Sequence, residues 1–182
     1  MSGMPQRGWT TRAAFAIWIT ALALVFCNGG CSVDSTAISQ VILPNRDEFI
    51  NKGVNTFMAQ RCGALDCHGQ TGRPLRLYST NGLRKNLSPN KGRDTRELQL
   101  DELTDNYFSV VGLEPEEITT SMATQGQYTQ FLLLLKPLSI EGGGVRHKGG
   151  PVLRSTDQGF DCLASWAAGK VNAANCEAGL IR

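Results

Sequence analysis

Two cysteines and a histidine lie within a run of seven residues, and this segment constrains the fold more than any other feature of the chain. The segment reads Arg61-Cys62-Gly63-Ala64-Leu65-Asp66-Cys67-His68-Gly69. Because Cys67 and His68 are adjacent, their side chains leave the backbone at nearly the same place. The fold must therefore be organised around a group that both side chains reach, or around a bridge between the two thiols.

A histidine directly after a cysteine, with a second cysteine shortly upstream, is the signature of c-type haem attachment. Here it has the expanded form C-x4-C-H. The thiols must reach the two vinyl groups of one porphyrin edge, and the histidine must bind the iron. We therefore predict one haem c, attached through Cys62 and Cys67, with His68 as the proximal iron ligand. Gly63 is small and allows the longer loop to bulge.

Two other interpretations fit the same residues. Cys62 and Cys67 could close a small disulfide, which would leave His68 as an ordinary surface residue. Alternatively, these three residues and His147 form a nominal two-Cys, two-His zinc set. The zinc interpretation is the weakest, because export to an oxidising compartment works against two reduced thiolates.

The first thirty residues are typical of a secretory signal peptide. Arg7 and Arg12 form a positive region, and the apolar run from Ala13 to Phe26 follows. This run has fourteen residues, which is short for a helix that crosses a bilayer. We therefore predict that residues 1–30 are cleaved and that the mature protein is exported.

Cys31 is the predicted site of lipidation. Gly29 and Gly30 precede it, which resembles the lipobox of bacterial lipoproteins, although Asn28 stands where leucine is usual. Several acyl chains on one cysteine would anchor the protein to a membrane. We predict a lipidated tether over residues 31–44 and a location in the periplasm or at the outer membrane. Plain signal-peptide cleavage is the alternative.

The remaining cysteines, Cys162 and Cys176, follow one another closely near the C-terminus. In an exported protein such a pair is expected to form a disulfide. This bridge would restrict the unfolded chain and contribute roughly 2 to 4 kcal/mol.

Hydrophobic periodicity predicts helices on both sides of this segment. A helical stripe runs from Phe49 to Met58, after a capping box at Asn45 and Glu48. A closing helix is predicted from Ser155 to Gly169, with Trp166 at the edge of its buried face. A middle helix is predicted from Leu98, Leu100, Leu103, Tyr107 and Phe108, facing the porphyrin, and a further helix from Tyr128 to Leu135.

From Asn45 to Gly169 the sequence resembles the cytochrome c-like domains of exported bacterial lipoproteins. The resemblance lies chiefly in the segment from Arg61 to Gly69, and more weakly in the words R-L-Y, G-L-E-P-E, L-x-K-P and H-K-G-G. It implies a mainly α fold, a bundle of about four helices with long glycine-rich loops around one haem. We assign this domain to residues 45–182.

A haem that transfers electrons needs a second axial ligand, usually Met or His. His147 lies in a glycine-rich loop shortly before the closing helix, and Met122 is the alternative candidate. His147 could instead bond a haem propionate or the backbone. If neither residue reached the iron, the sixth site would be open and peroxidase-like chemistry would be possible.

The charge balance excludes some functions. All sixteen acidic residues lie after Cys31, as do sixteen of the eighteen Lys and Arg, so the mature chain is formally neutral. Net neutrality gives no basis for nucleic-acid binding. We predict an electron carrier rather than an enzyme, bound to a membrane by its lipid anchor and serving a redox partner of unknown identity. The alternative is a disulfide-stapled envelope lipoprotein without haem, in a structural or binding role.

Overall fold

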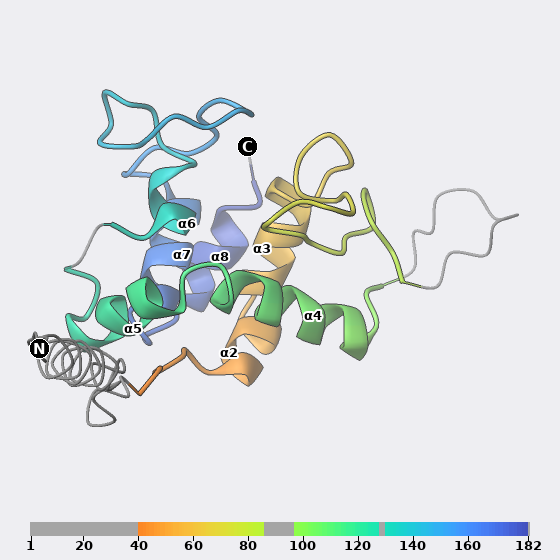
Figure 1. Ribbon diagram of the computed structural model, residues 1–182, viewed down its shortest axis with the longest axis horizontal. Coiled ribbons are helices and arrows are strands. Elements are labelled where there is room, and N and C mark those ends of the chain that lie inside the picture. The colour runs from red at the N-terminus through yellow and green to blue at the C-terminus, as the bar shows by residue number, and fades with distance from the viewer. Residues whose placement is uncertain (1–39, 86–96, 128–129, 182) are drawn as a thin grey trace, which may run out of the picture. The chain divides into compact units, whose positions relative to one another are not determined.

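A computed structural model describes residues 40–85, 97–127 and 130–181. Seven helices and no strand occur in these ranges (Figure 1), which confirms the mainly α prediction. A single isolated β-bridge joins Tyr78 and Leu83. The helices are α2 (Arg46–Asn51), α3 (Val54–Arg61), α4 (Leu100–Val111), α5 (Pro115–Ala123), α6 (Leu132–Leu135), α7 (Gln158–Ala167) and α8 (Ala173–Ala178).

The predicted first helix is two helices, α2 and α3, divided at Gly53. The side chain of Asn45 caps α2 by accepting the N–H of Glu48 at 3.0 Å, as the capping pattern predicted. Gly53 has a φ of 85°, a left-handed conformation that favours glycine. A β-carbon at Gly53 would also lie 3.1 Å from Cβ of Cys176. The helical stripe is therefore continuous in sequence, but the backbone turns to let the C-terminal segment approach.

Helices α3, α7 and α8 pack closely because two glycines lie where they meet. A β-carbon on Gly159 would lie 2.5 Å from the ring of Phe57, and one on Gly179 would lie 2.7 Å from Cα of Gly159. The predicted disulfide between Cys162 and Cys176 is present and joins α7 to α8. The opening and closing helices are thus held by backbone proximity and by a covalent bridge.

The aromatic centre of the core lies between α2, α4 and α7. The ring of Phe49 lies 5.1 Å from that of Trp166 and 5.8 Å from that of Tyr107, between ring centroids. Trp166 is fully buried, so its predicted place at the edge of the helix face was wrong. Helix α7 also begins at Gln158 rather than at Ser155, with Asp157 as its N-cap residue.

Helix α4 presents a different face from the predicted one. Leu100 and Phe108 are 69% and 57% exposed, whereas Glu102 and Asn106 are buried. The polar residues are tolerated inside because both are hydrogen-bonded. Glu102 pairs with Arg84, and Asn106 bonds both the N–H and the carbonyl of Tyr78, at 2.6 and 2.9 Å.

The compact unit begins at Val41, so residues 41–44 belong to it. Ile42 is bonded through its backbone N–H and carbonyl to the hydroxyl of Thr119 on α5, at 3.0 and 3.1 Å. The hydroxyl of Tyr107 donates to the carbonyl of Pro44 at 2.8 Å. The signal peptide, Cys31 and the tether up to residue 39 lie outside the described residues. Of the predicted helix from Tyr128 to Leu135, residues 132–135 form α6, residues 130 and 131 are not helical, and residues 128 and 129 are not described.

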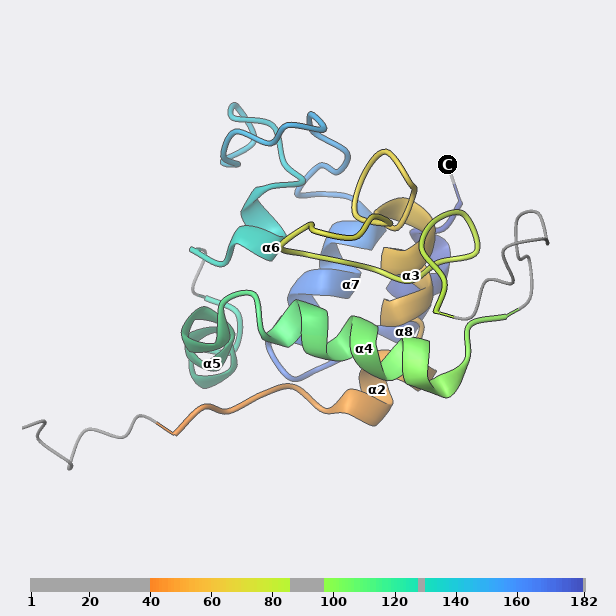
Figure 2. The same ribbon diagram turned by 45° about the vertical axis from the view of Figure 1, so that its right-hand side comes forward.

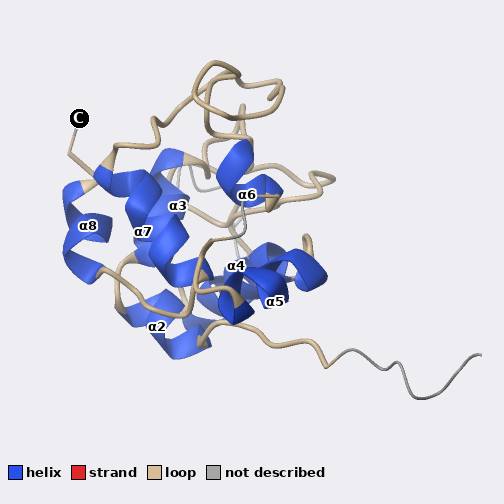
Figure 3. Cartoon of the chain, turned by 90° about the vertical axis from the view of Figure 1, so that its left-hand side faces the viewer, coloured by secondary structure: helices blue, strands red, loops and turns tan. Residues whose placement is uncertain are grey.

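Two groups of loops lie together at one end of the unit, after α3 and between α6 and α7 (Figures 1 and 2). The segment that leads in from residue 41 lies at the opposite end, near α2 and α5, in all three views (Figure 3). No helix within the described ranges is long and apolar enough to cross a membrane.

Candidate functional site

The two cysteines and the histidine of the motif lie in a tight loop at the end of α3. Cys62 is the C-cap residue of that helix, and its N–H bonds the carbonyl of Met58 at 2.8 Å. The loop then closes on itself, because the N–H of His68 bonds the carbonyl of Cys62 at 3.0 Å and that of Cys67 bonds the carbonyl of Ala64 at 3.0 Å. The expanded spacing thus forms a compact turn rather than an extended bulge.

A second loop holds this turn in place, and the sequence analysis did not identify it. The carbonyl of Gly63 accepts a hydrogen bond from the hydroxyl of Ser79. β-Carbons built on Gly69 and Gly82 would lie 2.2 and 2.0 Å from the same carbonyl oxygen. Only glycine fits at these positions without a shift of backbone. The Thr80-Asn81-Gly82 turn was visible in the sequence, but its contact with residue 63 was not.

Both thiols of the motif are free and partly buried. Burial, with a smaller contribution from the neighbouring Cys67, raises the pKa of Cys62 to about 11, and Arg61 opposes both effects. Burial, with the charge of Asp66, also raises the pKa of Cys67. The protonated thiol, rather than the reactive thiolate, is therefore the favoured form of both cysteines. The Cys62–Cys67 disulfide of the alternative interpretation is not formed.

His68 has one ring nitrogen engaged and one free. Its Nδ1 lies 2.9 Å from the carbonyl oxygen of Leu75. A carbonyl only accepts hydrogen bonds, so Nδ1 carries the proton and Nε2 keeps its lone pair. Burial lowers the pKa of His68, an effect opposed by the bond to Leu75 and reinforced by His147 and Arg73. The neutral imidazole, which is the form that binds metals, is therefore favoured.

His147 has the same arrangement. Its Nδ1 lies 3.0 Å from the carbonyl oxygen of Gly150, so in the neutral tautomer Nδ1 carries the proton and Nε2 has the lone pair. The loop around it is fixed to α6, since the N–H of Val145 bonds the carbonyl of Leu135 at 3.2 Å and the ammonium of Lys136 bonds the carbonyl of Arg146 at 3.2 Å.

The structure brings these two imidazoles close together from loops 79 positions apart in sequence. Their ring centroids are 6.0 Å apart and their planes lie within 10° of parallel. Neither Nε2 forms a hydrogen bond within the described residues. Met122, the other candidate for the second ligand, lies on α5 with its methyl group against Gly169.

The residues present fit a haem better than a bare metal ion. Two imidazoles that bind one metal from opposite sides through bonds of about 2.0 Å have centroids roughly 6 Å apart. The observed 6.0 Å agrees with this length, and coordination would further require each Nε2 lone pair, which lies in its ring plane, to point at the metal. No group of three or more His, Cys, Asp and Glu able to hold an ion exists among the described residues, so the two-Cys, two-His zinc set is not assembled. A porphyrin supplies the four in-plane ligands that the chain does not.

Of the cations that follow the motif, Arg76 has an unfulfilled hydrogen-bonding group. Its Nε is buried without an acceptor, and its guanidinium carbon lies 5.5 Å from the ring centroid of Tyr78. By contrast, Arg84 pairs with Glu102, and Lys85 pairs with Asp101 and Asp105. A carboxylate, such as a haem propionate, would satisfy Arg76.

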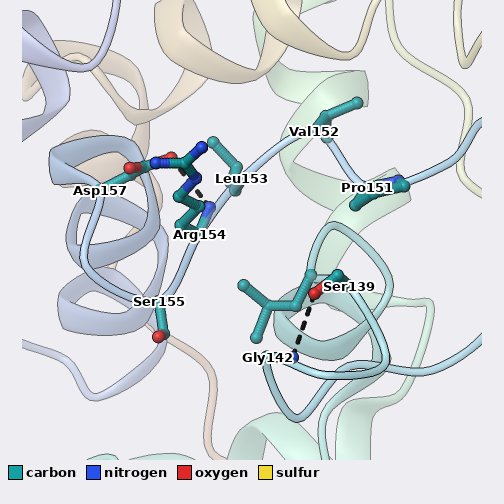
Figure 4. A pocket seen from close by; sticks show the side chains of 9 residues that line it. Ser139, Gly142, Pro151, Val152, Leu153, Arg154, Ser155 and Asp157 are labelled. Atoms are coloured by element: carbon teal, nitrogen blue, oxygen red, sulfur yellow. Dashed lines mark hydrogen bonds between the residues drawn. The ribbon is translucent and has the colours of Figure 1, made fainter.

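Two cavities lie beside the loop that carries His147. The larger, of about 390 Å³, contains neither histidine nor cysteine and is therefore separate from the candidate site (Figure 4). Its lining includes Ser139, Pro151, Arg154 and Asp157. The carboxylate of Asp157 accepts the backbone N–H of Arg154 at 2.8 Å. The smaller cavity, of about 220 Å³, has His147 on its wall.

Comparison with models of protein families, with curated proteins and with solved structures finds no match to this chain.

Proposed function

We propose that this protein is a single-electron carrier that binds one c-type haem through Cys62 and Cys67, with His68 and His147 as the two axial ligands. The observation that carries the proposal is the close, nearly parallel pair of imidazoles, each with Nδ1 bonded to a backbone carbonyl and Nε2 without a hydrogen bond among the described residues. A metal-bound histidine usually donates its other N–H in this way, which fixes the tautomer and the orientation of the ring.

The chain supplies attachment, orientation and burial, while the haem supplies the redox chemistry when bound. Leu75 and Gly150 hold the two imidazoles in fixed positions, so little rearrangement is needed when the charge at the site changes. If both His68 and His147 bound the iron, no coordination position would remain open. The site therefore favours electron transfer over peroxidase-like catalysis.

The proposal includes export and a lipid anchor at Cys31. The basic and apolar residues before Cys31 support export. The disulfide between Cys162 and Cys176 also supports it, because disulfides persist in oxidising compartments such as the periplasm. Lipidation would hold the domain at the periplasmic face of the inner or outer membrane.

The proposal is tested on protein exported in a strain that has a c-type maturation system. A pyridine haemochrome spectrum should show a reduced α band. The intact mass should equal the chain from Cys31 plus one haem and the acyl groups, less the two hydrogens lost when the disulfide forms. Replacement Cys67→Ser should shift the α band, and His68→Ala should abolish stable haem. Lys148→Ala, beside His147, is the matched control and should retain the unshifted α band and the bound haem. Colourless wild-type protein would leave only a disulfide-stapled envelope lipoprotein.

A further inference from the structure

The charges of this formally neutral chain are divided between its two ends. Residues 61–85 and 136–157, which hold the two histidines, carry nine Lys and Arg and three Asp and Glu. Residues 97–127, which contain α4 and α5, carry seven Asp and Glu and neither Lys nor Arg. Arg84 and Lys85 pair with Glu102, Asp101 and Asp105 of α4, which leaves seven Lys and Arg against three Asp and Glu in the histidine loops and four other Asp and Glu in residues 97–127. The remaining excess of cations favours a positive potential at the histidine loops.

The cations nearest the histidines have no acidic partner. The ion pairs in the described part of the chain join α2 residues to their neighbours, or join Arg84 and Lys85 to α4. None involves Arg73, Arg146 or Lys148. Arg73 is close enough to influence Cys67 and His68 electrostatically, while Arg146 and Lys148 are exposed on either side of His147. Their charges are therefore available to a partner.

The chain reaches the domain at the acidic end. Ile42 is bonded to Thr119 on α5, and Pro44 to Tyr107 on α4. In the views of Figures 1 and 2 this segment lies opposite the loops that carry the histidines. A lipid at Cys31 would thus hold the acidic end toward the membrane.

The length of the tether limits how far the domain can rotate relative to the membrane that anchors it. Ten peptide steps separate Cys31 from Val41 and span at most roughly 35 Å. A domain of about 140 residues has a radius of gyration of roughly 14 Å, so a path around half of its surface is roughly 55 Å. The tether is too short to bring the histidine end against the same membrane.

We propose that the basic loops around His68 and His147 form a docking face for an acidic protein partner on the side away from the anchoring membrane. This proposal rests on the haem and the lipid anchor proposed above. Arg73, Arg146 and Lys148 provide the charge, and complementary charge raises the rate of encounter at low ionic strength. The alternative occupant, an anionic membrane surface, is an outcome of the test.

The test uses the mature, lipidated holoprotein in neutral detergent and two redox probes of opposite charge. Reduced protein gives one electron to ferricyanide, an anion, or to tris(phenanthroline)cobalt(III), a cation. Steering changes such rates by about 10-fold or more. We expect the ferricyanide rate to fall and the cobalt rate to rise as salt is added. Rates that depend on salt in the same direction for both probes would overturn the proposal.

Two double variants test whether the charge that steers the probe lies at Arg146 and Lys148. R146E/K148E should lower the ferricyanide rate at low salt about tenfold. The control K52E/K170E changes the net charge equally at other sites, where Lys52 pairs with Glu48 and Lys170 bonds Gln125 on the α5 side. It should change the rate less than about twofold. Equal effects of the two double variants would overturn the docking face.

Vesicles distinguish a protein partner from a membrane. The protein is reconstituted in phosphatidylcholine with and without phosphatidylglycerol. We expect R146E/K148E to lower the ferricyanide rate by the same factor in both. If the basic face lay on the anionic bilayer, phosphatidylglycerol would suppress the wild-type rate and R146E/K148E would restore it, which would overturn the proposal. Colourless protein would instead remove the proposed function itself.

Discussion

Arg84 and Glu102 form a buried ion pair, with side chains 4% and 2% exposed, that joins the loop after the haem motif to α4. The pair has two hydrogen bonds, from Nε at 2.9 Å and from Nη2 at 3.0 Å. Glu102 also accepts the backbone N–H groups of Lys85 and Gln99. The carboxylate is therefore fully partnered and contributes to stability only while it is ionised.

This ion pair makes the free energy of unfolding depend on pH in the acid range. Burial raises the pKa of Glu102, but the bonds from Arg84 and the two backbone N–H groups outweigh burial and bring the pKa below its ordinary value of 4.5. A lowered folded-state pKa contributes stability that is present above the ordinary value and is lost as pH falls through the lowered one. We expect the free energy of unfolding to decline below about pH 4.5. Urea unfolding between pH 3 and 7 measures it.

Removal of one partner should cost far more than the pair itself contributes. Glu102→Gln leaves the buried guanidinium of Arg84 unpaired, and we expect a loss of about 3 kcal/mol at pH 7 with a flatter acid dependence. Glu116→Gln, an exposed change in the first turn of α5, is the control and should alter stability by less than about 0.5 kcal/mol. A loss equal to that of the control would show that the pair is not structural.

The crossing of α3 and α7 should not tolerate a side chain at Gly159. Gly159→Ala would place Cβ 2.5 Å from the ring of Phe57, so we expect a loss of about 2 kcal/mol or more. Gln158→Ala, the exposed neighbour, should have little effect. Thermal unfolding measures both, and the haem absorbance of the folded fraction should be unchanged. A neutral Gly159→Ala would contradict the described crossing.

The disulfide should stabilise the C-terminal helices without taking part in the redox site. It closes a loop with a sequence separation of 14, which corresponds to about 3 kcal/mol. C162S/C176S should therefore unfold at lower urea concentration, and reductant should lower the stability of the wild type but not of the variant. The midpoint potential of the haem should change little. A large shift in potential would show that the bridge supports the site directly.

Much of the helical framework follows from the sequence, because strongly periodic segments and caps are local signals. Asn45 and Glu48 marked the start of the first helix, and Gly169, with a φ of 75°, follows the end of α7, the predicted closing helix. The division at Gly53 was not predictable, since it depends on the approach of Cys176 from 123 positions away. Long-range packing decided the boundary.

The hydrophobic pattern predicted the buried residues of α4 only in part, for a physical reason. A pattern assigns leucine and phenylalanine to the inside, yet Leu100 and Phe108 are exposed while Glu102 and Asn106 are buried. Burial of polar groups is favourable only when their hydrogen bonds are satisfied, and the partners here come from residues 78 and 84. No local pattern reveals such partners.

The site was predictable in its residues but not in its geometry. The motif identified Cys62, Cys67 and His68, and the glycine-rich loop identified His147 as a candidate. The carbonyls of Leu75 and Gly150 could not be foreseen, because any residue can supply a carbonyl. These two bonds set the direction in which each imidazole presents Nε2.

The electron paramagnetic resonance spectrum of the oxidised protein at low temperature tests the central claim most directly. Two nearly parallel imidazoles, within 10° here, predict a low-spin rhombic iron signal. His147→Ala should convert it to a high-spin signal, and Met122→Leu should leave it unchanged. A low-spin signal that survives His147→Ala, or is lost in Met122→Leu, would contradict the proposed pairing of His68 and His147 about one iron.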